Sequence, residues 1–278
     1  MSTSSASSQT GPAAVGNDLR RFWALTYTLA ATDFKLRFFG SALGYLWSLM
    51  RPLLLFGVLY LVFTKVIRFG EGVKFYPVYL LTSIVLFTYF AETTAGGVTS
   101  LVDRENLLRK MRFPRMVIPL SVSLTALFNL GMNLLAVLVF ALASGVRPRL
   151  SWLQLPLLVL MLTVLAVGLA MLLSALYVRY RDLNPIWEVA LQLLFYASPV
   201  LYVLSTVPNS YERAWLANPI AVVLTQMRHA ILDPTAPSAA HAIGPDVRLL
   251  IPAGIVVLVF ALGFFVFMRE TPRIAENL

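Results

Sequence analysis

The chain has 278 residues, of which 59% are hydrophobic and 13% are charged, and its mean hydropathy is +0.78. Soluble domains usually carry about 25% charged residues, so this composition excludes a soluble enzyme, a disordered chain and a collagen-like chain. The absence of cysteine excludes disulfides, cysteine-ligated metals and thiol catalysis. In a membrane chain, a net charge of +9 indicates Lys and Arg on the cytoplasmic side rather than nucleic-acid binding.

The first forty residues predict two different segments. Residues 1–17 are small and polar, with neither a basic start nor an apolar run, so we expect a disordered tail and no signal peptide. Residues 18–40 mix charges with aromatic side chains, which favours an amphipathic helix that lies in the membrane interface and begins at Asp18. We expect residues 41–278 to form one membrane domain.

Six later segments are apolar enough and long enough to cross a bilayer, which takes about 20 residues. They cover residues 43–64, 75–91, 116–143, 150–178, 189–211 and 249–268. We expect Pro199 and Pro208 to shorten or break the fifth span. Residues 214–227 are also apolar, but their length favours a re-entrant segment between the fifth and sixth spans. The predicted fold is therefore an all-α membrane protein with six transmembrane helices.

An even number of spans places both termini on the same side of the membrane. With the termini inside, most of the 22 Lys and Arg residues fall on the cytoplasmic side, as the positive-inside rule requires. We therefore expect a multi-pass plasma-membrane protein with cytoplasmic N and C termini.

Several motifs of energy coupling and catalysis are absent from the sequence. It contains no GxxxxGK[ST] phosphate-binding loop and no HExxH, and its two histidines, His229 and His241, lie in one predicted outside segment. Glu92 and Glu188 are the acidic residues that stand out within or beside the spans, fewer than a bilayer proton pump usually carries. We expect no catalytic residue, no metal site and no cofactor bound by this chain.

Five segments together resemble the permease subunits of ABC-2 type polysaccharide exporters, the O-antigen, teichoic-acid and galactan exporter family. These segments are DFKLRFFGSALGYLW (33–47), ENLLRKMRFPR (105–115), RYRDLNPIW (179–187), YASPVLY (196–202) and LANPIA (216–221). They occur in the family's order and span nearly the whole chain after the tail. The resemblance is strongest to the galactan exporter permease of mycobacterial-type cell walls.

The resemblance implies an architecture and a set of partners. It implies six spans, an amphipathic interface helix before the first, a cytoplasmic coupling helix and re-entrant gate segments between the fifth and sixth. Two copies would pair above two separate ATPase subunits, which would hold the ATP and Mg²⁺. On charge alone, the basic stretch at 99–119 is equally compatible with an ordinary cytoplasmic loop. The residues expected to couple to the ATPase are Arg20, Arg21, Asp103, Arg104, Glu105, Asn106, Arg109, Lys110 and Arg112.

Helical spacing predicts a conduit along the first and fifth spans. Residues three or four apart share a helix face, and on these two spans such faces carry aromatic rings with occasional polar groups. Rings match the C–H faces of sugars, and amides and carboxylates match their hydroxyls. Alternatively, the aromatic stripes pack helices together or form interfacial belts. The channel residues that we predict are Tyr45, Phe56, Tyr60, Phe63, Glu188, Gln192, Phe195 and Tyr202.

Two further polar sets have more local roles. Thr125, Asn129 and Asn133 form a stripe on the third span, which favours hydrogen bonds between helices. Lys35, Arg37 and Arg51 lie near the cytoplasmic end of the first span, where they would meet the diphosphate of a lipid-linked glycan at a lateral entrance. Snorkelling to lipid headgroups is the alternative for Arg51.

The sequence therefore predicts the transmembrane subunit of an ATP-driven exporter of a lipid-linked cell-envelope polysaccharide, with galactan as the expected glycan. An ABC-2 exporter of drugs or lipids is the nearest alternative. A membrane-embedded glycosyltransferase would need clustered carboxylates or a metal site. A proton-coupled secondary transporter would work without an ATPase subunit.

Overall fold

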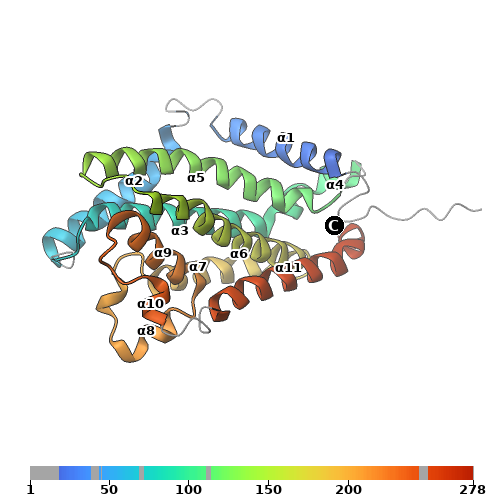
Figure 1. Cartoon of the computed structure of the whole chain (residues 1–278). Coiled ribbons are helices and arrows are strands. Elements are labelled where there is room, and N and C mark those ends of the chain that lie inside the picture. The colour runs from blue at the N-terminus through green and yellow to red at the C-terminus, as the bar shows by residue number, and fades with distance from the viewer. Residues whose placement is uncertain are drawn as a thin grey trace, which may run out of the picture.

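The computed structural model describes residues 19–38, 44, 46–68, 72–110, 114–243 and 250–277, and every regular element in these ranges is helical. Tyr45, Arg112, the expected N-cap Asp18 and the expected tail at 1–17 lie outside the described residues. Figure 1 shows the long helices running side by side, with short helices gathered at one end of the bundle.

Five stretches of the described residues are long and apolar enough to cross a membrane, which makes the chain a multi-pass membrane protein. They match the first, second, third, fourth and sixth predicted spans. The helices concerned are α2 (Leu46–Tyr60) with its π-helical extension Leu61–Val66, α3 (Tyr76–Asp103), α5 (Val117–Ala143), α6 (Gln154–Tyr177) with the 3₁₀ turn Leu150–Leu153, and α11 (Leu250–Asn277).

The fifth predicted span does not form one continuous helix. Helix α7 (Leu183–Ala197) has 15 residues and ends directly before an extended Ser198, with φ −101° and ψ 148°. Pro199 follows, and a proline cannot supply the N–H that would continue the helix. The expected break at Pro199 is therefore confirmed, and α7 alone is shorter than the roughly 20 residues of a full span.

Short helices follow the break and lie at the end of the bundle where α5 ends and α6 begins (Figure 1). They are α8 (Asn209–Trp215), α9 (Pro219–Met227), the π-helical turn Arg228–Leu232 and α10 (Ala239–Ile243). The Asn218 side chain caps α9 by accepting a hydrogen bond from the Ile220 amide at 3.0 Å. Helix α9 is buried against α6 and α11. A re-entrant position for this apolar segment stays a prediction.

Helix α3 lies at the centre of the bundle. It packs against α2, α5, α6 and α7, and 78% of its most apolar stretch is buried, against 6% for the stretch that contains α2. Its largest fully buried side chains are Tyr79, Tyr89 and Phe90. Helix α2 is therefore an outer helix whose surface is left to lipid or to another chain.

Helix α1 (Leu19–Phe38) confirms a helix in the range predicted for the interface segment. It runs along the first half of α5: Phe22 packs with Val117 in one cluster, the Ala30 carbonyl accepts a hydrogen bond from Thr125 at 3.2 Å, and Phe34 meets Phe128 with ring centres 5.8 Å apart. The two helices therefore run in the same direction and stay in contact over about three turns. The N-terminal end of α1 lies near the short helix α4 (Glu105–Lys110), as Figure 1 shows.

The close crossing of α6 and α11 leads to a stability prediction. A Cβ atom on Gly263 would lie 2.0 Å from the Gly168 carbonyl oxygen, so Gly263→Ala must push the two helices apart. Overpacking of this kind typically costs about 1–3 kcal/mol, and we expect a lower melting temperature for the purified protein in nanodiscs. Gly254→Ala in the same helix is the control, because a Cβ there meets nothing within 4 Å. Equal melting temperatures for both variants would contradict this packing.

Candidate functional site

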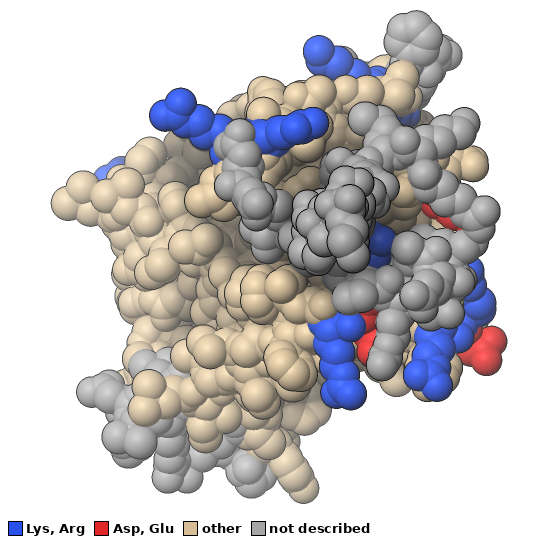
Figure 2. Space-filling view, turned by 90° about the vertical axis from the view of Figure 1, so that its right-hand side faces the viewer, with Lys and Arg blue, Asp and Glu red and all other residues tan. Residues whose placement is uncertain are grey.

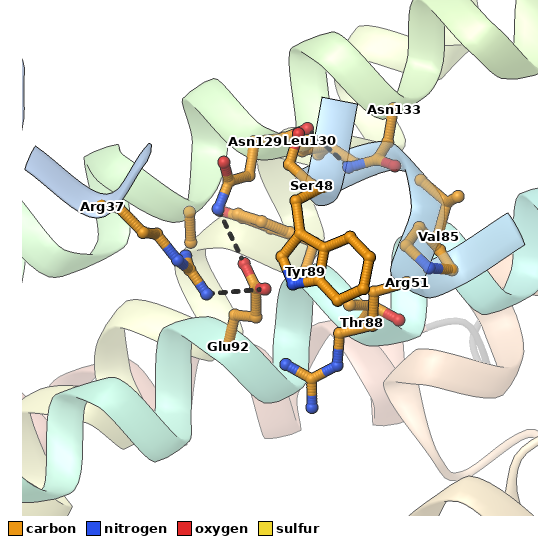
Figure 3. Close-up of a pocket in the computed structure, with 13 residues that line it drawn as sticks. Arg37, Ser48, Arg51, Val85, Thr88, Tyr89, Glu92, Asn129, Leu130 and Asn133 are labelled. Carbon is orange, nitrogen blue, oxygen red and sulfur yellow. Dashed lines mark hydrogen bonds and ion pairs between the residues drawn. The ribbon is translucent and has the colours of Figure 1, made fainter. Parts of the chain in front are cut away.

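A paired carboxylate lies inside the bundle, on α3. Arg37 of α1 donates a hydrogen bond to one oxygen of Glu92 at 3.2 Å, and Asn129 of α5 donates to the other oxygen at 3.1 Å (Figure 3). The Glu92 side chain is 21% exposed. Ionised groups in membrane helices are costly unless they are paired or reach water. These two donors explain how an apolar helix tolerates the charge, and they tie three helices together.

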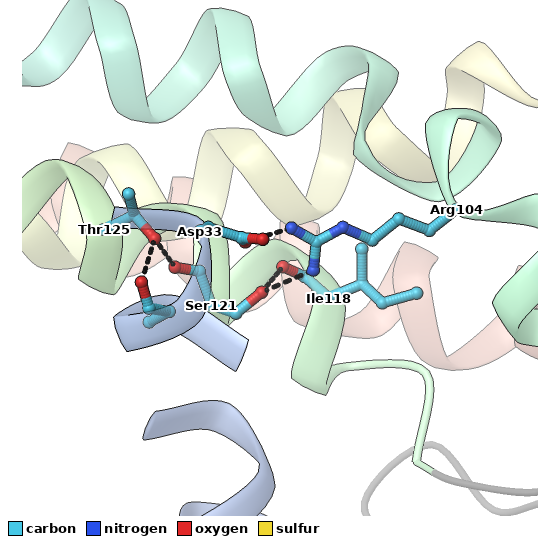
Figure 4. Close-up of polar contacts among 6 residues, drawn as sticks. Asp33, Arg104, Ile118, Ser121 and Thr125 are labelled. Atoms are coloured by element: carbon cyan, nitrogen blue, oxygen red, sulfur yellow. Dashed lines mark hydrogen bonds and ion pairs between the residues drawn. The ribbon is translucent and has the colours of Figure 1, made fainter. Parts of the chain in front are cut away.

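A second polar cluster joins the same three helices toward the α4 end of the bundle (Figure 4). The Arg104 guanidinium forms an ion pair with Asp33 of α1 and donates to the Ser121 hydroxyl of α5 at 3.1 Å. Asp33 and Arg37 are four residues apart, so they share one face of α1. Helix α1 is therefore held by two ion pairs: it supplies the cation to Glu92 of α3 and the anion to Arg104, the residue that follows α3.

The polar stripe on α5 makes the interhelical bonds that were expected of it. Thr125 donates to the Ala30 carbonyl of α1, and Asn129 donates to Glu92 of α3. Asn133 instead donates to the Asn129 carbonyl of its own helix at 2.9 Å. The prediction is confirmed for the first two residues.

A polar pocket of about 260 Å³ lies beside Glu92, between α1, α2, α3 and α5 (Figure 3). It contains both Arg37 and Arg51, two of the three residues predicted for a lipid-diphosphate entrance, whereas Lys35 is exposed on α1 and is not part of the lining. In Figure 3 the Glu92 carboxylate is bonded to Arg37 and Asn129, and no bond joins it to Arg51. The side chains that line the pocket are those of Arg37, Trp47, Ser48, Arg51, Pro52, Val85, Thr88, Tyr89, Glu92, Ala126, Asn129, Leu130 and Asn133.

A larger groove of about 860 Å³ lies between α2, α3 and α7. It brings together Gln192 and Phe195, both predicted channel residues, with Arg51 from the predicted entrance. The Phe195 ring meets Phe87 of α3 edge-on, with ring centres 5.1 Å apart. Arg51 and Glu92 border both the pocket and the groove, so the two cavities adjoin. The groove combines rings, an amide and a guanidinium on one surface.

The structure does not bring Phe56, Tyr60 or Phe63, the described members of the aromatic stripe on the first span, to this groove. Phe56 stacks on Tyr60 with ring centres 5.6 Å apart, and it meets Phe140 of α5 edge-on at 5.7 Å. Phe63 packs, half-buried, against the same core. The groove instead takes Arg51, Pro52 and Leu55 from α2. The reason is that ring contacts turn the aromatic face of α2 toward α5, which is the helix-packing alternative.

Glu188 and Tyr202, the other predicted channel residues, flank the groove region along the chain. Glu188 is exposed on α7, one turn before Gln192, and accepts a hydrogen bond from Asn184 at 2.9 Å. Tyr202 lies beyond the end of α7, where its hydroxyl donates to the Tyr196 carbonyl at 3.1 Å. Neither residue belongs to the lining of the groove.

Two tyrosines of α3 hold the non-helical backbone that follows α7. The Tyr76 hydroxyl donates to the Leu201 carbonyl at 2.7 Å, and the Tyr79 hydroxyl contacts the carbonyls of Pro199 and Tyr202. Irregular backbone is tolerated at membrane depth only where protein groups satisfy it. The break in the fifth span is therefore a fixed feature of the bundle.

The described residues that were predicted to couple to the ATPase gather at one end of the molecule, and one of them faces inward. Arg104 turns inward to Asp33. Figure 2 shows this end, where Lys and Arg side chains are spread more widely than Asp and Glu. Arg109 and Lys110 belong to α4, but their side chains lie outside the described part. The exposed members are Arg20, Arg21, Asp103 and Asn106, and Glu105 is half-buried.

Comparison with known proteins identifies the family. The model of the ABC-2 type transporter family matches residues 24–232. The chain belongs to this family. It is 32% identical to the O-antigen export system permease protein RfbA of Myxococcus xanthus over 224 residues, which cover 80% of this chain and 85% of that protein.

Other relatives of this ABC-2 chain carry related names. RfbA of Klebsiella pneumoniae, also an O-antigen export system permease protein, is 29% identical over 212 residues, which cover 76% of this chain and 81% of that protein. The polysialic acid transport protein KpsM of Escherichia coli is 22% identical over 202 residues, with coverage of 72% and 78%. The family that the five sequence motifs indicated is confirmed.

Glu92 stands out in the sequence as an acidic residue within a span, but no role was predicted for it. Its partners come from α1 and α5, 55 and 37 residues away along the chain, so no local pattern connects them. Only the chemistry of Glu92 indicated that it has partners on other helices. A carboxylate in an apolar helix requires a cation or an amide, and Arg37 and Asn129 were already singled out for other reasons.

The ion pair between Asp33 and Arg104 can be tested by exchanging its charges. Asp33→Arg or Arg104→Asp alone places like charges together, and we expect each to destabilise the protein by about 1.5–3 kcal/mol, the range for hydrogen bonds to charged groups. The double variant restores an opposite pair and should recover most of the lost melting temperature. Lys35→Gln, an exposed neutralisation on the same helix, is the control. A double variant no more stable than the worse single variant would refute the pairing.

Proposed function

We propose that this ABC-2 permease is the transmembrane subunit of an ATP-driven exporter that moves a lipid-linked cell-envelope polysaccharide from the cytoplasm to the outer side of the plasma membrane. The observation that carries the proposal is the groove between α2, α3 and α7, in which aromatic rings stand beside polar groups. The names of the relatives support the substrate class, since they concern O-antigen export and polysialic acid transport.

The chemistry of the groove suits a sliding glycan. Phe195, with the buried Phe87 packed edge-on against it, offers an apolar ring surface, and Gln192 and Thr88 would exchange hydrogen bonds with hydroxyls. Many weak and interchangeable contacts suit transport, because a tight site would hold the polymer still. Glu188 lies one turn from Gln192 on the same exposed helix, and we place it along the same path.

The lining of the path is incomplete in one chain. No residue of α7 is fully buried, although the helix carries apolar side chains and Gln192 along its length. We infer that a second copy covers this side and closes the conduit. Galactan is the specific glycan that we propose, on the basis of the sequence motifs.

The energy for export would come from partner chains. The sequence has no phosphate-binding loop, so we assign ATP and Mg²⁺ to two separate ATPase subunits beneath the dimer. These subunits would contact one end of the molecule and displace it. That end carries Arg20, Arg21, Asp103, Asn106 and α4. The same end would face the cytoplasm, with both termini, because positive residues gather on that side.

Arg51 is the residue that we place at the lateral entrance for the lipid diphosphate. It is exposed and borders both cavities, and no ion-pair partner is found for it among the described residues. Arg37 is already paired with Glu92, which leaves Arg51 as the stronger candidate. Guanidinium groups suit phosphate because their donors match its oxygens in pairs.

Depletion of the protein in its host tests this function. We expect one lipid-linked polysaccharide to accumulate on the cytoplasmic side, because its synthesis continues while its export stops. Extraction and sugar analysis of the lipid-linked fraction would identify it. If no glycan accumulates although the protein is gone, the proposed function is wrong, and a drug or lipid exporter becomes the better reading.

Complementation of the depleted cells with variants refines the same experiment. Arg51→Gln should restore export only weakly at normal membrane abundance, whereas Arg149→Gln, at an exposed arginine in the loop between α5 and α6, should restore it fully. Normal export by Arg51→Gln would remove the diphosphate entrance and leave the export function in place.

A further inference from the structure

The polar pocket beside Glu92 has no role in the path described so far. It lies beside the groove, and at about 260 Å³ it falls below the range of roughly 300–1,000 Å³ that suits drug-sized ligands. Its size therefore fits a small ligand or one unit of a larger one. Since it adjoins the groove at Arg51 and Glu92, a unit of a polymer lying in the groove can reach it.

The charges of the pocket are compensated in part. Glu92 and Arg37 form an ion pair at 3.2 Å, so their charges compensate each other inside the pocket. Arg51 also belongs to the lining and stands at the border between the pocket and the groove. Beside this ion pair the lining offers hydrogen-bonding groups next to apolar surface, a combination that suits a neutral sugar, and Arg51 adds a further positive charge at the border with the groove.

The individual groups match a polyol. Each oxygen of Glu92 accepts one hydrogen bond from the protein and retains a lone pair for a ligand hydroxyl. Asn133 uses its amide N–H on the Asn129 carbonyl, which leaves its carbonyl oxygen as an acceptor. The indole of Trp47 also belongs to the lining and is 54% exposed, so a flat apolar surface is available.

We propose that this pocket is a subsite for a single neutral sugar unit of the exported glycan, with Trp47 against the C–H face of the sugar and Glu92 and Asn133 as hydroxyl acceptors. The proposal rests on the function proposed above and adds the part of the substrate that this chain recognises. The sugar would lie next to Arg51, so the same element of α2 would contact both the glycan and its phosphate.

Binding of simple glycosides tests the subsite directly. The full chain is purified into lipid nanodiscs without glycoside detergents, and saturation-transfer NMR is recorded with the methyl glycosides of galactofuranose, galactopyranose, mannose and rhamnose. We expect at least one glycoside to receive saturation on its C–H protons. Trp47→Leu and Asn133→Leu should each weaken binding about tenfold, the effect of losing roughly 1.4 kcal/mol.

A matched control separates the pocket from general aromatic contacts. Trp23→Leu removes a similarly exposed indole from α1, outside the pocket, and should leave the NMR signal unchanged. Each variant is compared at equal abundance and with a normal size-exclusion profile. Absence of signal with every glycoside, or equal signals in wild type and both pocket variants, overturns the proposal. Displacement of the glycoside by inorganic pyrophosphate would also overturn it, because the pocket would then be an anion site.

The same variants in depleted cells keep this inference apart from the export function. If depletion causes a glycan to accumulate but both pocket variants export normally, the subsite is wrong and the export function stands. If depletion causes no accumulation, the export function fails, and the NMR experiment still reports whether the pocket binds sugar.

Discussion

A carboxylate in the middle of an apolar helix needs partners, and the rest of this structure is arranged around the partners of Glu92. Arg37 and Asn129 reach it from α1 and α5, and the pairing fixes both helices against α3. Glu92 also borders three neighbouring cavities, of about 260, 450 and 860 Å³. One paired charge therefore both holds the bundle and places polar surface beside the proposed path of the substrate.

The position of α1 connects the end of the molecule assigned to the ATPase with the helix that borders the groove. Its first residues lie at the end of the molecule assigned to the ATPase, and its last turns carry Asp33 and Arg37, which bind α3. A displacement of α1 would therefore be transmitted to α3, the helix that forms the floor of the groove. Helices α2 and α7, which form the walls, are little buried and can move with a small loss of packing.

Much of the fold could be predicted from the sequence because apolar runs of membrane length leave few alternatives. Five spans, the helix before the first span and the break at Pro199 were all predicted from local patterns. The bonding of Thr125 and Asn129 was also predicted, since polar side chains inside a membrane seek partners on other helices.

The candidate site was harder to predict, because it depends on which faces of the helices contact one another. Both sides of α2 are apolar, and only contact with Phe140 decides that Phe56 turns toward α5. Arg104 lies in a basic stretch typical of a surface loop, yet it pairs with Asp33, 71 residues earlier in the chain. Gln192 and Phe195 do line the groove, as expected of a polar and aromatic face on a helix that the bundle leaves uncovered.

The most direct test of the account is the solvent accessibility of the groove in the membrane. The chain has no cysteine, so single cysteines need no further changes. We expect Gln192→Cys to react with a charged, membrane-impermeant maleimide in inverted vesicles, and to be protected when lipid-linked glycan accumulates. Val58→Cys, on an exposed apolar face of α2, should remain unreactive in both conditions. Reaction of Val58→Cys but not of Gln192→Cys would contradict a glycan path between α2 and α7.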